Sequence, residues 1–170
     1  MKIKDISLCG LFAALLSVCA WLSFPVGEIS VTLQTLAAFL ALGLLGGFRG
    51  TVAIAVYLFM GAVGLPVFSG FRGGFSILLG PSGGYLWGFL LSGLLFWLLT
   101  AGSNAKRIPL ALILAQLLCY CIGSLWYFYA WLPQGSFIAI LLTCVVPYLL
   151  PDAIKLFLAI FLIKRIKPFV

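Results

Sequence analysis

Long stretches without a charged side chain restrict this chain more than any other feature of its sequence. They run over residues 6–27, 29–48, 50–71, 73–105 and 108–151. A helix needs about 20 apolar residues to cross a hydrocarbon core about 30 Å thick, so each stretch is long enough for at least one crossing. Of the 170 residues, 65% are hydrophobic and only 8% are charged, far fewer than in soluble domains. The sequence therefore predicts an integral membrane protein.

The number of crossings follows from breaks inside the two longest stretches. A Gly-Pro-Ser-Gly-Gly run at 80–84 interrupts one of them, and Pro-Gln-Gly at 133–135 interrupts the other. The first break leaves one helix after it, and the second separates two helices. We therefore predict a single domain over residues 1–170, an all-α bundle of six transmembrane helices. These are expected at approximately residues 6–24, 32–47, 51–64, 85–100, 108–132 and 138–164.

Basic residues predict how the bundle lies in the membrane. The chain has 10 Lys and Arg, 3 Asp and Glu and no His. Eight of the ten basic residues precede the first helix, follow the last one or occupy every second loop, whereas the opposite loops carry only Arg72. Because basic residues accumulate in cytoplasmic loops, both termini are predicted to be cytoplasmic and the protein to lie in the cell membrane. The net charge of +7 thus indicates topology, and nucleic acid is not expected as a partner. The eight residues are Lys2, Lys4, Arg49, Lys106, Arg107, Lys164, Arg165 and Lys167.

The residue types that are missing argue against an enzyme. Without His the chain has no His-based metal site or catalytic triad, and it has no Gly-x-x-x-x-Gly-Lys-Ser/Thr loop for ATP. The five Cys residues lie in apolar stretches without a Cys-x-x-Cys pair, so we interpret them as small hydrophobic side chains. We predict no catalytic residue, no metal and no resident cofactor.

Asp152 and Lys155 are charged residues inside the last predicted helix. A charge at the centre of a membrane helix costs about 2.5–3.5 kcal/mol, and helix rise puts these two roughly 18 Å and 13 Å from Lys164. Their i, i+3 spacing places both on one helix face, where they can pair. One interpretation is an ion pair that only holds the bundle together. The other is a ligand site in which the carboxylate accepts N–H bonds and the ammonium donates to a carbonyl, as a cyclic urea or amide requires. Pro147 and Pro151 predict that this helix is kinked or starts late.

Further polar features lie toward the outer side of the predicted bundle. Gln34, at the start of the second helix, offers hydrogen-bond donors and an acceptor to a ligand, or else meets water and headgroups. The segment 64–74 is rich in Gly, Pro and aromatic residues, which suits either a lid over a cavity or an ordinary glycine-capped loop. Arg72 and the amides that start the fourth helix are both candidates for holding an anionic group.

The first helix carries two pairs of small residues at i, i+4 spacing, on neighbouring stripes. Small residues let membrane helices approach closely, so this face is a candidate docking surface for another protein. Such pairs are also common in membrane helices that dock nothing. The residues are Gly10 with Ala14 and Ala13 with Ser17.

Several motifs together resemble the BioY family, the biotin-binding substrate components (S components) of energy-coupling factor (ECF) transporters. The Gly-Pro-Ser-Gly-Gly-Tyr block is the most specific of them, and the Asp-x-x-Lys motif agrees with it. Two positions depart from the usual family pattern, since Ser82 replaces Thr and Pro151 replaces Gly. In order, the motifs are TLQT at 32–35, GAVGLPVF at 61–68, GPSGGYLWGF at 80–89 and PYLLPDAIK at 147–155.

The resemblance implies a six-helix bundle of the S-component type that captures biotin from outside, under the loops after the first and third helices. It implies that Asp152 and Lys155 contact the ureido ring, that Tyr85 and Gln34 line the site, and that Phe68 packs against the apolar part of biotin. The face of the first helix would dock a transmembrane coupling protein, which associates with two ATPase subunits. A solitary biotin transporter without these subunits and a purely structural membrane protein are the alternative hypotheses.

Overall fold

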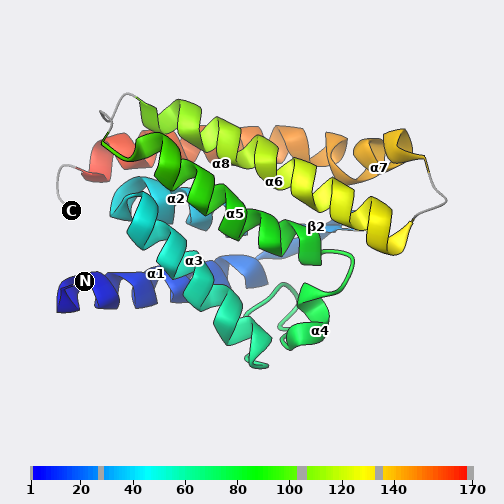
Figure 1. The fold of residues 1–170 in the computed structure, drawn as a ribbon, viewed down its shortest axis with the longest axis horizontal. Coiled ribbons are helices and arrows are strands. Elements are labelled where there is room, and N and C mark those ends of the chain that lie inside the picture. Colours follow the sequence, from blue (N-terminus) through cyan, green and yellow to red (C-terminus); the bar gives the residue numbers. More distant parts are fainter. Residues whose placement is uncertain (1, 27–28, 103–106, 133–135, 168–170) are drawn as a thin grey trace.

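The computed structural model describes residues 2–26, 29–102, 107–132 and 136–167, which form a bundle of helices with one small β-ribbon (Figure 1). The two strands, β1 (Ser23–Val26) and β2 (Ile29–Thr32), pair antiparallel with Ser23 opposite Thr32. The helices are α1 (Ile3–Trp21), α2 (Gln34–Leu45), α3 (Gly47–Ala62), α4 (Phe75–Leu78), α5 (Gly83–Thr100), α6 (Ile108–Trp131), α7 (Phe137–Cys144) and α8 (Val146–Ile166).

Four of these helices, α1, α5, α6 and α8, are long and apolar enough to cross a membrane. The helices α2 and α3 are equally apolar but have 12 and 16 residues, which corresponds to about 18 Å and 24 Å of helix. Both are shorter than one crossing of the hydrocarbon core. The fold is thus the expected helical membrane bundle, and the count of six spans stays a prediction.

Close packing of the bundle depends on small residues at helix contacts. A Cβ added to Gly50 of α3 would collide with the backbone of α2 at Ala41 and Leu42, and one added to Gly88 of α5 would collide with Cys119 of α6. These positions let neighbouring backbones approach, which is how membrane helices gain packing energy without a hydrophobic driving force. The buried core lies where α1, α2, α3, α5 and α6 meet, with Leu16, Leu42, Ile54, Phe96 and Leu112 almost fully covered.

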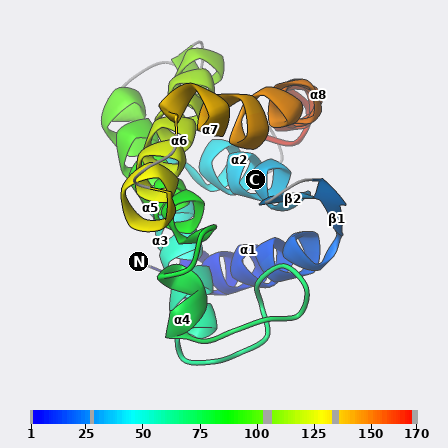
Figure 2. The ribbon, with the colours of Figure 1, turned by 90° about the vertical axis from the view of Figure 1, so that its right-hand side faces the viewer.

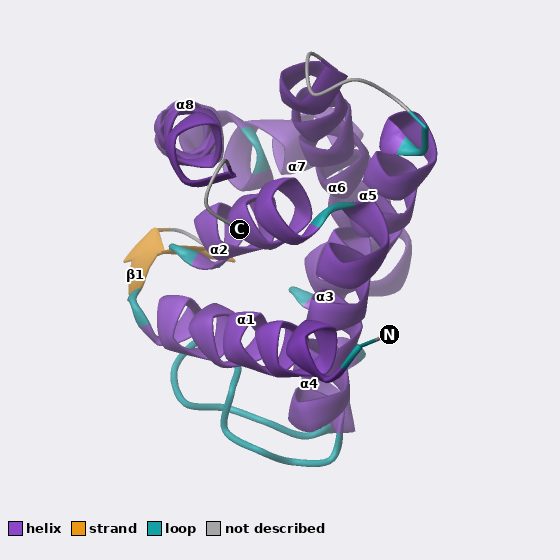
Figure 3. Cartoon of the chain, turned by 90° about the vertical axis from the view of Figure 1, so that its left-hand side faces the viewer, coloured by secondary structure: helices purple, strands orange, loops and turns teal. Residues whose placement is uncertain are grey.

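The two ends of the bundle differ in charge. The start of α1, the junction of α2 with α3 and the end of α8 lie at one end, onto which Figure 3 looks, and they carry Lys4, Arg49 and Lys164. The opposite end, shown in Figure 2, holds the β-ribbon, α4 and the loops around it, with Arg72. This is the grouping that the predicted topology requires. Which end faces the cytoplasm stays a prediction.

The last predicted helix, over 138–164, is divided at Val145 into α7 and α8. Pro147 is the physical reason, because it lacks an N–H for the carbonyl four residues earlier and instead occupies the first turn of α8. Pro151 lies inside α8, one residue before Asp152. The expected late start of the helix that carries Asp152 therefore corresponds to a separate short helix before it.

The predicted docking face of α1 needs a correction. Ala13 and Ser17 are 1% and 5% exposed because this stripe of α1 packs inside the bundle, and the Ser17 hydroxyl donates to the Ala13 carbonyl. Gly10 and Ala14 lie on the outward stripe, and a Cβ on Gly10 would meet nothing within 4 Å. Only Gly10 and Ala14 thus remain available to another protein.

Candidate ligand-binding site

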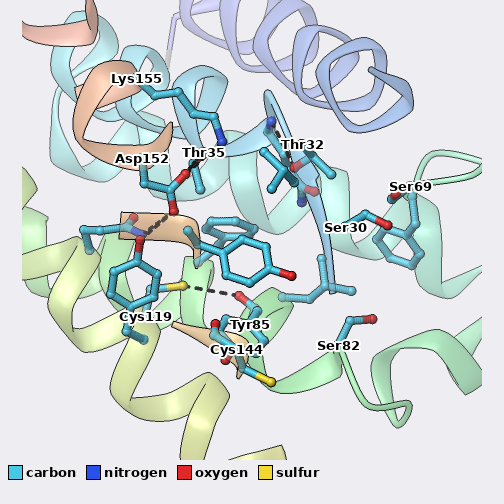
Figure 4. Close-up of a pocket in the computed structure, with 18 of the residues that line it drawn as sticks. Ser30, Thr32, Thr35, Ser69, Ser82, Tyr85, Cys119, Cys144, Asp152 and Lys155 are labelled. Carbon is cyan, nitrogen blue, oxygen red and sulfur yellow. Dashed lines mark hydrogen bonds and ion pairs between the residues drawn. The ribbon is translucent and has the colours of Figure 1, made fainter. Parts of the chain in front are cut away.

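A cavity opens between α2, α5, α6 and α8 beneath the loop that follows α3, and Figure 4 shows the side chains that surround it. It encloses about 900 Å³ of space not occupied by protein atoms, including its open mouth. All six predicted binding residues line the cavity, although they come from four separate parts of the sequence. They are Gln34, Phe68, Arg72, Tyr85, Asp152 and Lys155.

The carboxylate of Asp152 is the centre of a polar network at the buried side of the cavity. Its Oδ1 accepts hydrogen bonds from the Lys155 ammonium at 2.8 Å and from the Thr35 hydroxyl at 3.2 Å. Its Oδ2 accepts bonds from the Tyr120 hydroxyl at 2.7 Å and from the Gln116 amide at 3.1 Å. Four donors, one of which is the positively charged Lys155 ammonium, stabilise the carboxylate of a residue that is only 7% exposed.

Three helices supply this network. The i, i+3 spacing of Asp152 and Lys155 on α8 brings the ion pair together, as the sequence predicts. The i, i+4 spacing of Gln116 and Tyr120 aligns both on one face of α6, and Thr35 lies in the first turn of α2. Sequence reasoning missed Gln116, Tyr120 and Thr35 as site residues. A signal existed for Gln116, which is the single amide side chain in the whole of α6.

Gln34 brings an unused donor to the cavity. Its side chain is 4% exposed, and its Nε2 has no hydrogen-bond partner among the described residues. Leaving a buried amide unpaired costs about 1–3 kcal/mol, so such a group indicates a partner that is absent from the free protein. A ligand oxygen in the cavity would satisfy it.

Two aromatic rings form apolar walls, and each lies against a glycine. The ring of Tyr85 occupies the place where a Cβ of Gly123 would be, and its hydroxyl donates to the Cys144 carbonyl at 3.3 Å. The ring of Phe68 fills the corresponding space at Gly61. Glycine at these positions therefore lets the rings pack directly on the helix backbone, which fixes the shape of the cavity.

The segment between α3 and α5 contributes to the lining of the cavity and is tied to α1. The Trp21 indole donates to the Pro66 carbonyl at 2.8 Å, and its ring stacks on Phe71 with centroids 4.9 Å apart. Phe71 has a φ of 56°, which non-glycine residues rarely adopt, at the tip of a turn closed by the bridge between Phe68 and Arg72. The segment is thus an ordered turn fastened to the end of α1, and its role as a lid stays a prediction.

Of the two candidates for holding an anion, Arg72 is the better placed. Its Nε donates to the Ser69 carbonyl at 3.1 Å, which anchors the side chain, and in the described part of the chain its two Nη groups have no hydrogen-bond partner. The amides of Gly83 and Tyr85 at the start of α5 already donate to the carbonyls of Gly80 and Ser82. The cavity therefore has a donor-rich buried side around a paired carboxylate and a guanidinium at its mouth.

A helical bundle with apolar spans and a deep cavity built around one compensated carboxylate defines a membrane-embedded binding protein for a small polar molecule. Comparison with known proteins gives the family. The sequence profile of the BioY family matches residues 1–170, and the chain belongs to that family.

Two relatives illustrate the relationship. The biotin transporter BioY of Thermotoga maritima is 44% identical over 115 residues, which are 67% of this chain and 68% of that protein. The probable biotin transporter BioY of Pyrococcus horikoshii is 34% identical over 168 residues, 98% of each chain.

Solved structures agree in fold. The S component for biotin from an ECF-type ABC transporter superimposes with a TM-score of 0.87 at 24% identity, over 99% of this chain and 93% of that one. The S component of a bacterial ECF transporter superimposes with a TM-score of 0.66 at 17% identity, over 99% and 98% of the two chains. At these identities the likeness concerns the fold alone.

Proposed function

We propose that this protein is a biotin-binding S component that takes up biotin across the cytoplasmic membrane. The observation that carries the proposal is the pairing of Asp152 with Lys155 at the buried side of a cavity whose mouth holds Arg72. Membership of a family whose named members are biotin transporters supports the choice of ligand.

Biotin has the chemistry that this arrangement complements. Its ureido ring has two N–H donors and one carbonyl, which suit the Asp152 carboxylate and the donors on Lys155 and Gln34. Its sulfur-containing ring and valeryl chain are apolar, and the rings of Tyr85 and Phe68 offer matching walls. Its carboxylate suits the free Nη groups of Arg72, since guanidinium binds carboxylate through two parallel hydrogen bonds.

Uptake needs energy that this chain does not supply. We propose that an ECF module supplies it, consisting of a transmembrane coupling protein and two ATPase subunits, and that the coupling protein docks on the outward stripe of α1 at Gly10 and Ala14. Biotin uptake by cells that express this chain and lack every coupling ATPase would instead support a solitary transporter.

The first experiment separates ligand binding from a purely structural ion pair. In the double variant Asp152→Asn/Lys155→Met both charges leave together, so no charge stays unpaired in the bundle and the fold is expected to persist. Radiolabelled biotin binding to purified protein in detergent should fall at least 100-fold, with an unchanged elution volume in gel filtration. Wild-type affinity in this variant would contradict the site, and absence of biotin binding by the wild type would contradict the function.

A second experiment tests the position of the biotin carboxylate. Arg72→Gln should weaken biotin about 10- to 100-fold but leave the affinity for biotin amide, which lacks the negative charge, within about threefold. Dethiobiotin, which keeps the ureido ring and the carboxylate, should lose affinity equally with biotin. An equal loss for biotin and biotin amide would show that Arg72 does not contact the carboxylate.

A further inference from the structure

A second pocket lies at the end of the bundle opposite the cavity mouth, where the start of α1, the α2–α3 junction and the end of α8 meet (Figure 3). It encloses about 510 Å³, measured in the same way as the ligand cavity. Its lining combines four charged residues with an apolar wall of three leucines. They are Lys4, Asp5, Arg49 and Lys167, with Leu8, Leu44 and Leu45.

The charges in this pocket do not cancel. Asp5, which is 7% exposed, pairs with Arg49 at 3.3 Å and accepts the backbone N–H of Lys2 at 3.0 Å. That ion pair uses the single acid of the pocket. Within the described residues neither Lys4 nor Lys167 has an ion-pair partner, so two positive charges remain uncompensated.

Two of the pocket's walls, α1 and the α2–α3 junction, are joined by direct contacts. The Cys9 thiol donates to the Arg49 carbonyl at 3.4 Å, and Leu8 packs against the small buried cluster of Cys9, Leu45 and Ala53. A ligand that enters this pocket therefore contacts both cationic side chains and leucines at the ends of the helices.

We propose that this pocket binds the phosphate of an anionic lipid headgroup. A phosphate matches the excess of two positive charges, and the leucine wall suits the glycerol and first methylenes of an acyl chain. Basic pockets between the ends of transmembrane helices are where anionic headgroups bind. The proposal is independent of the biotin site, which lies toward the other end of the bundle.

The test compares two double variants that each remove two positive charges from the same end. Lys4→Gln/Lys167→Gln alters the pocket but leaves the Asp5–Arg49 pair intact, and Lys164→Gln/Arg165→Gln alters exposed residues outside the pocket. The probe is phosphatidylglycerol titrated into purified protein in dodecyl maltoside, with phosphatidylcholine as the neutral lipid. Thermal unfolding and native mass spectrometry report binding. One Lys near a membrane surface is worth about fivefold in affinity, so the pocket variant should bind phosphatidylglycerol roughly 30-fold more weakly.

The control variant should stay within about twofold of wild type. Equal effects of the two lipids on wild type, or equal losses in the two double variants, would overturn the proposal. Inorganic phosphate that stabilises wild type as well as phosphatidylglycerol does would assign the pocket to free phosphate and overturn the lipid. Unchanged lipid binding by the pocket variant with weaker assembly on the ECF module would assign the pocket to an acidic partner segment and also overturn the proposal.

Discussion

The Lys155 ammonium lies 2.8 Å from the Asp152 carboxylate, with each side chain about nine-tenths buried in a helix apolar enough to cross a membrane. The carboxylate has three further donors, whereas the ammonium keeps hydrogens that no described side chain accepts. A ligand carbonyl can therefore bind Lys155 without breaking the pair. Ligand N–H groups must instead share or displace donors on Asp152, which makes the carboxylate the more selective half of the site.

The pair should also determine the stability of the empty protein. Lys155→Met leaves the Asp152 charge buried without a counter-charge, which typically costs about 3–5 kcal/mol, whereas the double variant Asp152→Asn/Lys155→Met leaves none. We expect the single variant to have the lower thermal midpoint in detergent, measured without biotin. A double variant less stable than Lys155→Met would contradict this account of the pair.

Thr35 should affect binding through Asp152. Thr35→Val keeps the shape of the side chain but removes a donor to Oδ1, and loss of a bond to a charged group costs about 1.5–3 kcal/mol, or roughly 10- to 150-fold. Thr51→Val is the matched control, because the Thr51 hydroxyl is equally buried but donates to the Gly47 carbonyl away from the cavity. Biotin titration of both proteins checks the prediction, which requires a larger affinity loss for Thr35→Val.

Tyr120 should contribute although no motif marks it. Its hydroxyl makes the shorter of the two hydrogen bonds to Oδ2, so Tyr120→Phe should weaken biotin binding at least about 10-fold. Tyr129→Phe removes a hydroxyl from the exposed face of the same helix and should have no measurable effect. Isothermal titration calorimetry measures the biotin affinity of both variants. Equal affinities would show that Tyr120 does not contribute to biotin binding.

Biotin affinity should depend more on the glycine against which the Tyr85 ring packs than on the Tyr85 hydroxyl. Gly123→Ala places a methyl group where the Tyr85 ring packs, so the ring must shift into the cavity, and we expect at least a 10-fold loss of biotin affinity. Tyr85→Phe keeps the ring and loses one hydrogen bond to Cys144, for which about threefold is expected. The reverse order of the two losses would show that the hydroxyl, rather than the ring position, matters.

The tie between α1 and the lid should control how long biotin stays bound. Trp21→Phe keeps the stack on Phe71 but removes the hydrogen bond to Pro66, so biotin dissociation should be about fivefold faster. Stopped-flow or filter-binding chase experiments measure this rate. Trp97→Phe, which changes an indole near the other end of the bundle beside Phe48, should leave the rate unchanged. An unchanged biotin dissociation rate in Trp21→Phe would show that the hydrogen bond between Trp21 and Pro66 does not control biotin release.

The sequence predicts those parts of the site that are costly to place in a membrane. Asp152 and Lys155 are conspicuous because charges are rare at that depth, and their spacing on one helix requires no knowledge of other helices. Thr35 and Tyr120 are ordinary residues of apolar helices, and only the crossing of α2, α6 and α8 gives them a role. Their contribution depends on tertiary contacts that no local pattern encodes.

The orientation of α1 shows the same limit. Two stripes of small residues on neighbouring faces are equally suited to close approach, so the sequence could not tell which stripe the bundle itself uses. The structure uses Ala13 and Ser17 for its own packing. A break near the start of α8 can be predicted from the sequence, because Pro147 acts on the backbone locally.

The position of both charges on a single helix has a consequence for biosynthesis. Because Asp152 and Lys155 are one turn apart on α8, they enter the bilayer as a pair with no net charge, before any contact with other helices forms. The helices that complete the network, α2 and α6, contribute only neutral groups at Thr35, Gln116 and Tyr120. None of the three helices that build the network therefore brings an unpaired charge of this network into the bilayer, and the network is complete once α8 packs against α2 and α6.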